Sequence, residues 1–384
     1  MQAGIRQGYS TATDIREAVR QFQAAVDQPD LALVLFFCSS DYDLDLLASE
    51  LNRAFAGIQL VGCTTAGEIG PNGYRERGIV GVSFTRSVCS AVSGYCDHLC
   101  QFEPADGHAL TDRLQFELQH NAPLSSPQDT FALLITDGLS VREEVVARTV
   151  KEALGPIHMA GGSAGDGLNF NRTWVFANGS FRSDCAVLTL ISTPLPFTVF
   201  KTEHLVPTEE RWVITQADPS RRIVSEINGI PAAQEFARIA GVPIDALTPR
   251  HFAATPLAIS IDGSCYVRSI QKVNPDASIT FYCAIEEGVV LRVARGVRLV
   301  ENLEEAFARI RATIGPPLLV LACDCILRRM EIVDRHLEPQ IEQIFLRNST
   351  IGFNTYGEVL EGIHINQTLT GIAIGAGSSE VQGG

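Results

Sequence analysis

Short apolar runs alternate with amphipathic segments along the first half of the chain. Residues 31–38 form a continuous apolar run of strand length, which is typical of a strand buried on both faces. Segment 42–55 carries leucine and alanine at helical spacing, and Asp41 stands where a helix cap is expected. This pattern predicts a buried strand followed by a helix.

The same alternation continues to about residue 154. Further apolar runs and amphipathic stretches predict strands at 58–63, 79–85, 89–95 and 131–136, and helices at 109–120 and 142–154. Strands that alternate with helices favour the α/β fold class, with layered elements and mixed sheets.

The second half of the chain is richer in strands. Asn178-Gly179 is a hairpin signal, and we expect it to join strands at 174–176 and 186–190. Because the character of the sequence changes around 215–225, we predict two domains, residues 1–220 and 221–384. In the second we expect strands near 265–272, 279–285, 289–294, 318–323, 351–360 and 363–374, and helices near 302–314 and up to 346. We find no short-period repeat.

Composition and charge narrow the class of protein. Of the 384 residues, 46% are hydrophobic and 19% are charged, which favours a packed globular protein. The net charge of −14 argues against a nucleic-acid or anionic-membrane partner. The N-terminus does not resemble a signal peptide, and no apolar run near it approaches the ~20 residues of a membrane helix. We therefore expect a cytoplasmic protein whose ten cysteines are reduced.

One enzyme signature occurs in the chain. Segment 161–165, Gly-Gly-Ser-Ala-Gly, matches the elbow of serine hydrolases, which must lead from a strand into a helix. The following residues, 166–169, are turn formers, so we interpret the motif as a glycine turn. The chain has no Walker A or His-Glu-x-x-His motif. We therefore expect a protein that is not an enzyme.

Cys323 and Cys325 are the most suggestive cysteine pair. On a strand, side chains two residues apart point to the same face, so both sulfurs could meet one metal ion. Zinc would need two further ligands, and no second pair of this spacing is near in sequence. We favour buried free thiols over a metal or redox site.

A histidine stands in strand-like apolar surroundings. Within segment 197–207, alternation places Phe200, Thr202 and His204 on one face. A neutral imidazole beside apolar side chains suits a haem iron. The plainer interpretation is a hydrogen-bonded or surface histidine.

Polar residues near the end of the chain indicate a ligand pocket. Arg328 follows an apolar strand, and an Arg at the carboxyl end of a buried strand can clamp a carboxylate. Tyr356 and Glu358 flank a glycine that allows a tight turn. His364 and Asn366 share one face of a strand, and that face is either wet or lines a cleft. The alternative for Arg328 is a local salt bridge.

These motifs, in this order, resemble the FIST family. Segment 62–69, Gly-Cys-Thr-Thr-Ala-Gly-Glu-Ile, resembles the signature of the FIST N-terminal domain, and 161–166 resembles its glycine-rich turn. Segments 323–328, 352–358 and 364–368 resemble the FIST C-terminal domain. The resemblance implies a two-domain FIST architecture and a sensory protein with a small-molecule ligand.

Within the family, segments 200–204, 322–329 and 363–371 resemble the nitric-oxide-sensing haem proteins (NosP-like proteins). That resemblance implies haem b held by a histidine and nitric oxide bound at the iron. It also implies control in trans of a sensor histidine kinase or a cyclic-di-GMP enzyme. His204 is carried over as the first choice of iron ligand and His364 as the second.

Three hypotheses result. The first is a haem-based nitric oxide sensor, and the second is a sensory module that binds an amino-acid-like metabolite without haem. The third is an enzyme with Cys63 or Cys323 as nucleophile. A homo-oligomer is compatible with all three. The candidate ligand-pocket residues are Cys323, Arg328, Tyr356, Glu358 and Asn366.

Overall fold

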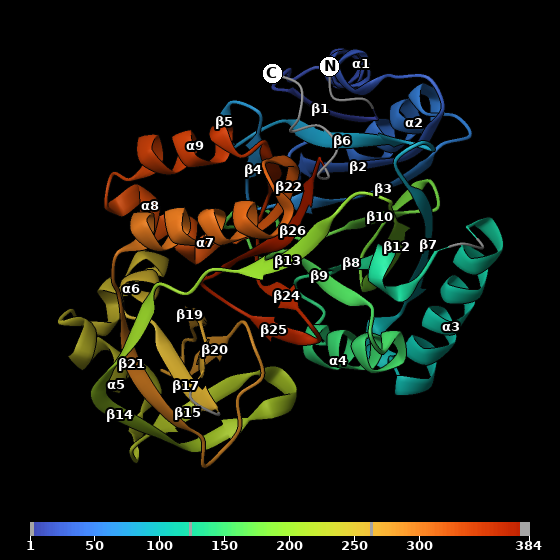
Figure 1. Cartoon of the computed structure of the whole chain (residues 1–384). Helices are drawn as coiled ribbons and strands as arrows, with labels where there is room; N and C mark the ends of the chain where they lie inside the picture. The colour runs from blue at the N-terminus through green and yellow to red at the C-terminus, as the bar shows by residue number, and fades with distance from the viewer. Residues whose placement is uncertain (1–3, 123–124, 262–263, 377–384) are drawn as a thin grey trace.

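Three six-stranded mixed sheets pack around one central core (Figure 1). The computed structural model describes residues 4–122, 125–261 and 264–376. Each mixed sheet holds one parallel pair of strands between antiparallel ones, and an eight-stranded antiparallel sheet lies beside them. This architecture confirms the predicted α/β class with mixed sheets.

The three mixed sheets arise from three repeats of the chain that share one order of elements: strand, helix, strand, helix, strand, hairpin, strand. The first comprises β1 (Ile5–Ser10), α1 (Ile15–Val26), β2 (Leu31–Ser39), α2 (Leu44–Ala54), β3 (Gln59–Thr65), β4 (Glu68–Gly70), β5 (Gly73–Arg75) and β6 (Ile79–Thr85). The second comprises β7 (Ser90–Asp97), α3 (Pro104–Asn121), β8 (Thr130–Thr136), α4 (Glu143–Leu154), β9 (His158–Ser163), β10 (Val175–Ala177), β11 (Ser180–Arg182) and β12 (Cys185–Ser192). The third comprises β13 (Phe197–Lys201), α7 (Leu299–Ile314), β22 (Pro317–Cys325), α8 (Ile326–Asp334), α9 (Glu338–Arg347), β23 (Thr350–Thr355), β24 (Glu358–Leu360), β25 (Ile363–Ile365) and β26 (Leu369–Gly375).

The third repeat is interrupted after β13 by a unit with its own hydrophobic core, which we call the inserted unit (residues 205–296). It occupies the lower left of Figure 1. Its elements are β14 (Leu205–Asp218), β15 (Ile223–Ile227), β16 (Ile230–Pro231), α5 (Ala232–Ala240), α6 (Pro249–Ala254), β17 (Leu257–Ile261), β18 (Ser264–Val267), β19 (Ile270–Val273), β20 (Ile279–Phe281) and β21 (Val290–Gly296). The predicted boundary between residues 220 and 221 falls inside this unit, and the division into domains 1–220 and 221–384 stays a prediction.

Each repeat donates its short hairpin to the sheet of another repeat. The strand orders are β1-β6-β2-β3-β10-β11, β7-β12-β8-β9-β24-β25 and β13-β26-β22-β23-β4-β5. The hairpin of the first repeat therefore completes the third sheet, that of the second completes the first sheet, and that of the third completes the second sheet. The three repeats are thus tied into one body by backbone hydrogen bonds.

A sequence motif and a strand pairing both recur in the repeats. A Gly-x-x-Thr-x-Gly-Glu motif begins at Gly62 on β3 and again at Gly352 on β23. In each of the three sheets the donated hairpin meets a glycine of the parallel pair: Phe176 pairs with Gly62, Val359 with Gly161, and Ile69 with Gly352. The equivalent glycines of the first two repeats, Gly62 and Gly161, are separated by about a quarter of the chain, which is why a search for short repeats finds nothing.

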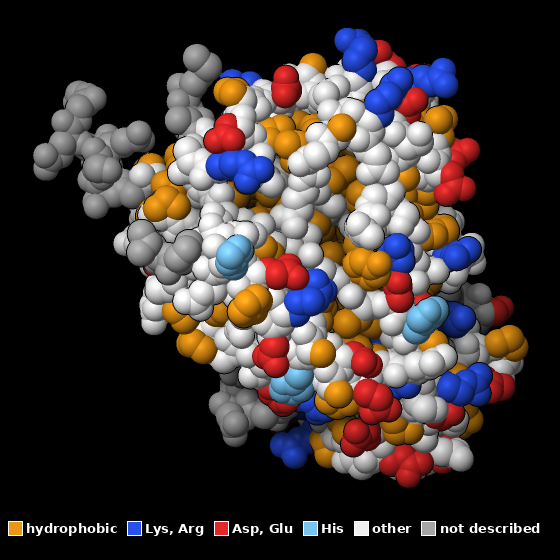
Figure 2. Space-filling model, turned by 90° about the vertical axis from the view of Figure 1, so that its right-hand side faces the viewer, with side chains coloured by type: hydrophobic (Ala, Val, Ile, Leu, Met, Phe, Trp, Pro, Cys, Tyr) orange, Lys and Arg blue, Asp and Glu red, His pale blue; other side chains and the backbone are white. Residues whose placement is uncertain are grey.

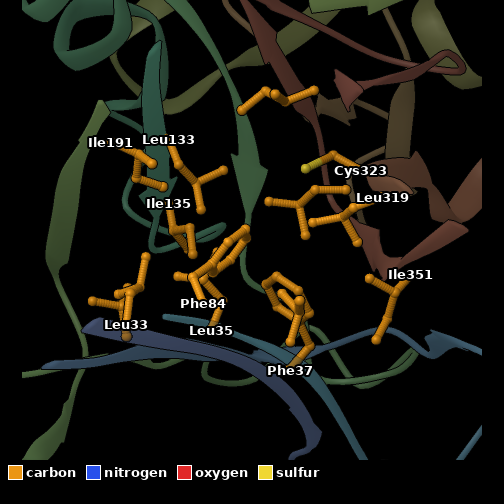
Figure 3. Close-up of a cluster of buried hydrophobic side chains, with 14 of the residues drawn as sticks. Leu33, Leu35, Phe37, Phe84, Leu133, Ile135, Ile191, Leu319, Cys323 and Ile351 are labelled. Atoms are coloured by element: carbon orange, nitrogen blue, oxygen red, sulfur yellow. The ribbon is translucent and has the colours of Figure 1, made fainter. Parts of the chain in front are cut away.

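Apolar side chains from all three sheets meet in the central core. Figure 3 shows Leu35 and Phe37 of β2, Ile135 of β8, and Leu319 and Cys323 of β22 converging there. The parallel strands are buried on both faces because helices cover their outer sides. This explains the continuous apolar runs in the sequence, and it confirms the strands predicted at 31–38 and 131–136.

Three local predictions are wrong. Asp43, not Asp41, caps α2, because its carboxylate accepts the Leu46 N–H. The Asn178-Gly179 turn joins β10 to β11, a shorter partner than the strand expected at 186–190, which pairs with β7 and β8 instead. The strand expected through His204 ends at Lys201, so the alternation that placed Thr202 and His204 on one face does not apply.

The surface mixes charges of both signs. On the face shown in Figure 2, Lys and Arg side chains alternate with Asp and Glu among the residues drawn in colour. Among the helices of the described residues, none combines the length and the apolar character needed to cross a bilayer.

Candidate functional site

A cavity of about 500 Å³ opens where strands of the first and third repeats end. Such carboxyl ends of parallel strands are where α/β proteins commonly place ligands. Its walls come from all three repeats and from the inserted unit. The lining residues are Ser39, Ser40, Asp41, Thr65, Ala66, Gly67, Arg75, Glu76, Arg77, Asp166, Gly167, Leu168, Asn169, Arg250, Ile326, Arg329, Met330, Val333, Asp334 and Asn354.

Helix α8 forms one wall of the cavity. Ile326, Arg329, Met330 and Val333 line it at spacings of three and four residues, which places them on one helical face. Arg328 lies on the opposite face and is buried. Helical geometry therefore gives the two neighbouring arginines different environments.

Arg329 presents a cation to the cavity. Its guanidinium carbon lies 3.7 Å from the centroid of the Tyr74 ring, within cation–π range. The Tyr74 hydroxyl donates to Asp324 Oδ2 at 2.6 Å, which fixes the ring beneath the guanidinium. Among the described residues Arg329 Nη1 is buried and has no hydrogen-bond partner. A buried donor without a partner is costly unless a ligand or water satisfies it.

The other charged groups of the cavity are mostly paired. Arg77 lies 3.2 Å from Asp41, and Arg250 of α6 lies 3.6 Å from Asp334. In the part of the chain that the structure describes, Glu76 has no ion-pair partner. Within the described residues two lining cations lack an ion-pair partner, but Arg75 donates to the Asn72 and Tyr74 carbonyls, whereas Arg329 Nη1 is buried without a hydrogen bond. Arg329 and Glu76 are therefore the cation and the anion left for a ligand, beside an apolar wall.

Asp166 organises the loop that borders the cavity. Its carboxylate accepts the backbone N–H groups of Phe170, Asn171 and Arg172 at 2.9–3.0 Å, together with the Tyr356 hydroxyl. Ser163 of the Gly-x-Ser-x-Gly motif is buried on β9, where its hydroxyl lies 3.2 Å from that of Thr136. The motif is followed by this loop rather than by a helix, as the turn-forming residues predicted.

The five predicted ligand-pocket residues lie beneath the cavity rather than in its wall. Arg328 pairs with Asp324 at 2.7 Å, and the Tyr356 hydroxyl donates a hydrogen bond to the Asp166 carboxylate. Asn366 donates to the Tyr356 carbonyl at 3.1 Å. All five residues are buried, and none belongs to the lining: Cys323, Arg328, Tyr356, Glu358 and Asn366. Their sequence neighbour Arg329 and the nearby Asn354 line it instead.

Two buried glutamates occupy equivalent places in the repeated motif. Thr65 Oγ1 donates to Glu68, and Thr355 Oγ1 donates to Glu358, each three residues along the chain. Burial raises the pKa of each carboxyl to about 8, although the threonine hydrogen bonds oppose the shift. Both groups therefore hold a proton at neutral pH.

The two candidate haem ligands lie beside different carboxylates, and only His204 forms a hydrogen bond in the described residues. His204 is 2% exposed and its Nε2 lies 2.7 Å from Glu331 Oε2 of α8. Burial opposes ionisation of Glu331, but the His204 hydrogen bond and charge lower its pKa overall. His364 is buried, with Nδ1 3.4 Å from Glu144 Oε1 of α4.

Neither of these histidines presents a ring nitrogen to the cavity. The ring nitrogen of His204 that reaches a partner is taken by Glu331, and neither histidine lines the cavity. Haem needs an axial nitrogen that opens into an apolar slot of macrocycle size. We therefore derive no chemistry through haem, and haem binding stays a prediction. For the Cys323–Cys325 pair, within residues 4–122, 125–261 and 264–376 no three His, Cys, Asp or Glu side chains are close enough to hold a metal ion.

Sequence reasoning missed Glu76 and the Asp166 loop as cavity residues, and of the two arginines that follow Cys325 it selected Arg328 rather than Arg329. One signal was available: the α8 residues that line the cavity follow a helical period directly after the strand that ends at Cys325. The contribution of Arg75–Arg77 had no such signal, because the hairpin that carries them is donated across repeats.

Family comparison defines the class of protein. The FIST N domain matches residues 32–230 and the FIST C domain matches residues 232–361. The chain belongs to the FIST family and is a sensory signalling module. It is similar to an uncharacterized protein of Methanocaldococcus jannaschii, at 21% identity over 386 aligned positions, covering 89% of this chain and 73% of that protein.

A solved structure corrects one expectation. Cyanuric acid hydrolase, described as an evolutionary innovation by structural concatenation, aligns with 97% of this chain and 99% of its own, at 9% identity and a TM-score of 0.36. Because this neighbour is an enzyme, the prediction that the protein is not an enzyme is withdrawn. At that TM-score the likeness assigns no activity to the chain.

Proposed function

We propose that this FIST protein senses an amino-acid-like metabolite, which binds in the cavity between the first and third repeats. The observation that carries the proposal is Arg329, a cation fixed over Tyr74 whose buried Nη1 has no partner among the described residues. A guanidinium matches a carboxylate in geometry and charge.

The rest of the cavity supports the same class of ligand. Glu76 supplies an unpaired carboxylate for an ammonium group. Ile326, Met330 and Val333 supply an apolar wall for a side chain. The other lining charges are ion-paired or hydrogen-bonded to the backbone, and the cations of the lining equal its anions in number. A ligand with one positive and one negative group therefore leaves the cavity neutral.

Isothermal titration of the purified protein with the twenty L-amino acids tests this proposal. We expect at least one to bind, and Arg329→Gln to weaken that binding about tenfold to a hundredfold, because a charged hydrogen bond contributes about 1.5–3 kcal/mol. Arg347→Gln is the matched control, since Arg347 pairs with Glu304 on the surface of α9 away from the cavity. Equal binding by Arg329→Gln, or no binding by any amino acid, would reject the proposal.

Haem-based sensing of nitric oxide is the competing function that the family resemblance implies. An absorption spectrum of protein produced with added haem, alongside His204→Ala and His364→Ala, decides between the two. A Soret band that shifts with nitric oxide and weakens in one variant would favour the haem sensor. The histidine geometry leads us to expect a flat spectrum in all three.

The output of the sensor belongs to the same proposal. We expect the signal to pass in trans to a sensor histidine kinase or a cyclic-di-GMP enzyme, as the family resemblance implies. Autophosphorylation of such a kinase, followed with and without the amino acid identified by titration, would test this step. A rate that does not depend on this protein would exclude that partner.

A further inference from the structure

The two connections to the inserted unit cross side by side. The chain enters the unit after His204 and leaves it at Gly296, and Leu205 pairs with Gly296 across β14 and β21. The Val297 N–H donates to the His204 carbonyl at 2.8 Å. We call residues 204–206 and 295–297 the root of the inserted unit. The covalent connection between the unit and the three repeats runs through this root.

The root is fastened to helix α8 by buried side chains. His204 Nε2 lies 2.7 Å from Glu331 Oε2, and Arg335 donates to Glu331 Oε1 at 2.7 Å. A side chain at Gly296 would overlap Glu331, so the glycine allows the root to approach the helix closely. The buried Glu331 carboxyl keeps one geometry through these hydrogen bonds, because breaking them would leave it without a partner.

The same helix lines the ligand cavity on its other face. Glu331 lies one residue from Met330 and two from Arg329, but the helical turn points it away from them toward the root. At the end of α8, Asp334 pairs with Arg250 of the inserted unit across the cavity mouth. Helix α8 is therefore in contact with the cavity, the root and the inserted unit at once.

We infer that α8 relays occupancy of the cavity to the inserted unit through the His204–Glu331 pair, which acts as the latch of its root. This inference rests on the proposed function, because it assigns the regulation of the same cavity. A ligand that packs against Met330 and pairs with Arg329 favours one position of α8, and the latch transmits that position to the root. A signal requires such a difference in affinity between two arrangements.

The test fills the cavity covalently, so that it does not depend on the identity of the metabolite. Met330→Cys is labelled with N-ethylmaleimide, and amide hydrogen exchange is followed at the root. The native protein treated with the same reagent accounts for labelling of the exposed Cys100. We expect labelling at position 330 to change exchange of the root amides by about tenfold.

Two latch variants and one matched control complete the experiment. In the Glu331→Gln and His204→Gln variants, we expect hydrogen exchange of the root amides to be the same with and without the label at position 330. In His158→Gln the response must persist, since His158 forms a comparable 2.8 Å pair with Glu361 away from the root. Thermal melts establish that each variant is folded, and Glu331→Gln, which is isosteric, decides alone if His204→Gln does not fold.

The outcomes separate this inference from the proposed function. The relay is overturned if labelling leaves hydrogen exchange of the root amides unchanged in the protein with an intact latch. It is also overturned if the change in exchange persists in both latch variants. Failure of every amino acid to bind, together with an intact relay, overturns the ligand assignment alone.

Discussion

At the scale of single residues, the equivalent glutamates Glu68 and Glu358 differ in the hydrogen bonding of one carboxyl oxygen, Oε2. Glu358 Oε2 accepts the N–H and the hydroxyl of Thr368. In the first repeat Gly78 occupies the place of Thr368, since Ser39 N–H donates to the Gly78 carbonyl as Cys325 N–H does to Thr368. Gly78 has no hydroxyl, and Glu68 Oε2 is buried without a partner in the described residues.

This difference predicts how stability depends on pH. Because burial raises the pKa of Glu68 to about 8, the native state keeps a proton that the unfolded state loses above its ordinary pKa. The stabilisation is complete below that ordinary value and is lost as pH rises toward 8. The side chain of Glu68→Gln cannot ionise. At pH 8 we therefore expect this variant to be more stable than the native protein, with a free energy of unfolding higher by on the order of a few kcal/mol.

Urea denaturation at pH 5.5 and pH 8 measures this effect. The comparison variant is Glu358→Gln, whose single amide oxygen cannot accept from both Thr355 and Thr368. At pH 5.5, where the native glutamates hold their protons, we expect this variant to be less stable than the native protein. If the native protein were equally stable at both pH values, the burial argument for Glu68 would be wrong.

The neighbouring arginines give a second prediction at this scale. Arg328→Met leaves Asp324 buried without its 2.7 Å partner, and we expect a loss of about 3–5 kcal/mol in the free energy of unfolding. Arg329→Gln removes no ion pair, so its effect on stability should stay below about 1 kcal/mol. Similar losses in both variants, measured by urea denaturation, would contradict the assignment of the two arginines to opposite faces of α8.

At the scale of elements, glycines set the spacing of the parallel strand pairs. A side chain at Gly161 would overlap the Leu134 carbonyl, and one at Gly352 would overlap that of Ala322. We expect Gly161→Ala and Gly352→Ala each to destabilise the protein by about 1–3 kcal/mol or to prevent folding. Gly70→Ala is the control, because its new methyl group would lie 3.4 Å from Val80, an ordinary contact. Thermal melts in which all three variants match the native protein would contradict the strand register.

Elements with a strong local signal could be read from the sequence, whereas their assembly could not. The run at 31–38 is apolar because β2 is buried on both faces, and that cause is visible without a structure. The hairpin at 68–75 gives no such signal, since its partner β23 lies nearly 300 residues away in the chain. Register across such a separation depends on tertiary packing, which periodicity does not encode.

The candidate site shows the same limit at closer range. Arg328 was chosen for its place after a buried strand. The arginine that lines the cavity is its neighbour Arg329, one residue further along the chain. The one-residue difference is set by the phase of α8, which depends on where the helix begins after Cys325. His204 and His364 were chosen by their apolar neighbours, and the carboxylates that lie beside them come from helices distant in the sequence.

At the scale of the whole molecule, the inserted unit has a core of its own and a narrow root. Replacing residues 204–297 by a short Gly-Ser linker should therefore leave the three repeats folded. We expect cooperative thermal unfolding by circular dichroism, at a lower temperature than for the full chain. Part of the loss would come from Glu143, which pairs at 2.6 Å with Arg222 of the inserted unit. A product that aggregates or melts without cooperativity would show that the unit is part of the folding nucleus.

The exchange of hairpins has a consequence for synthesis on the ribosome. The second sheet is completed by β24 and β25, which follow β9 by nearly 200 residues. One edge of strand β9 therefore stays unpaired while roughly 200 further residues are synthesised. At about 5–20 residues per second this synthesis takes on the order of ten to forty seconds. An open edge of this kind invites pairing with other chains. We therefore expect this edge to close only when β24 has emerged and paired with β9.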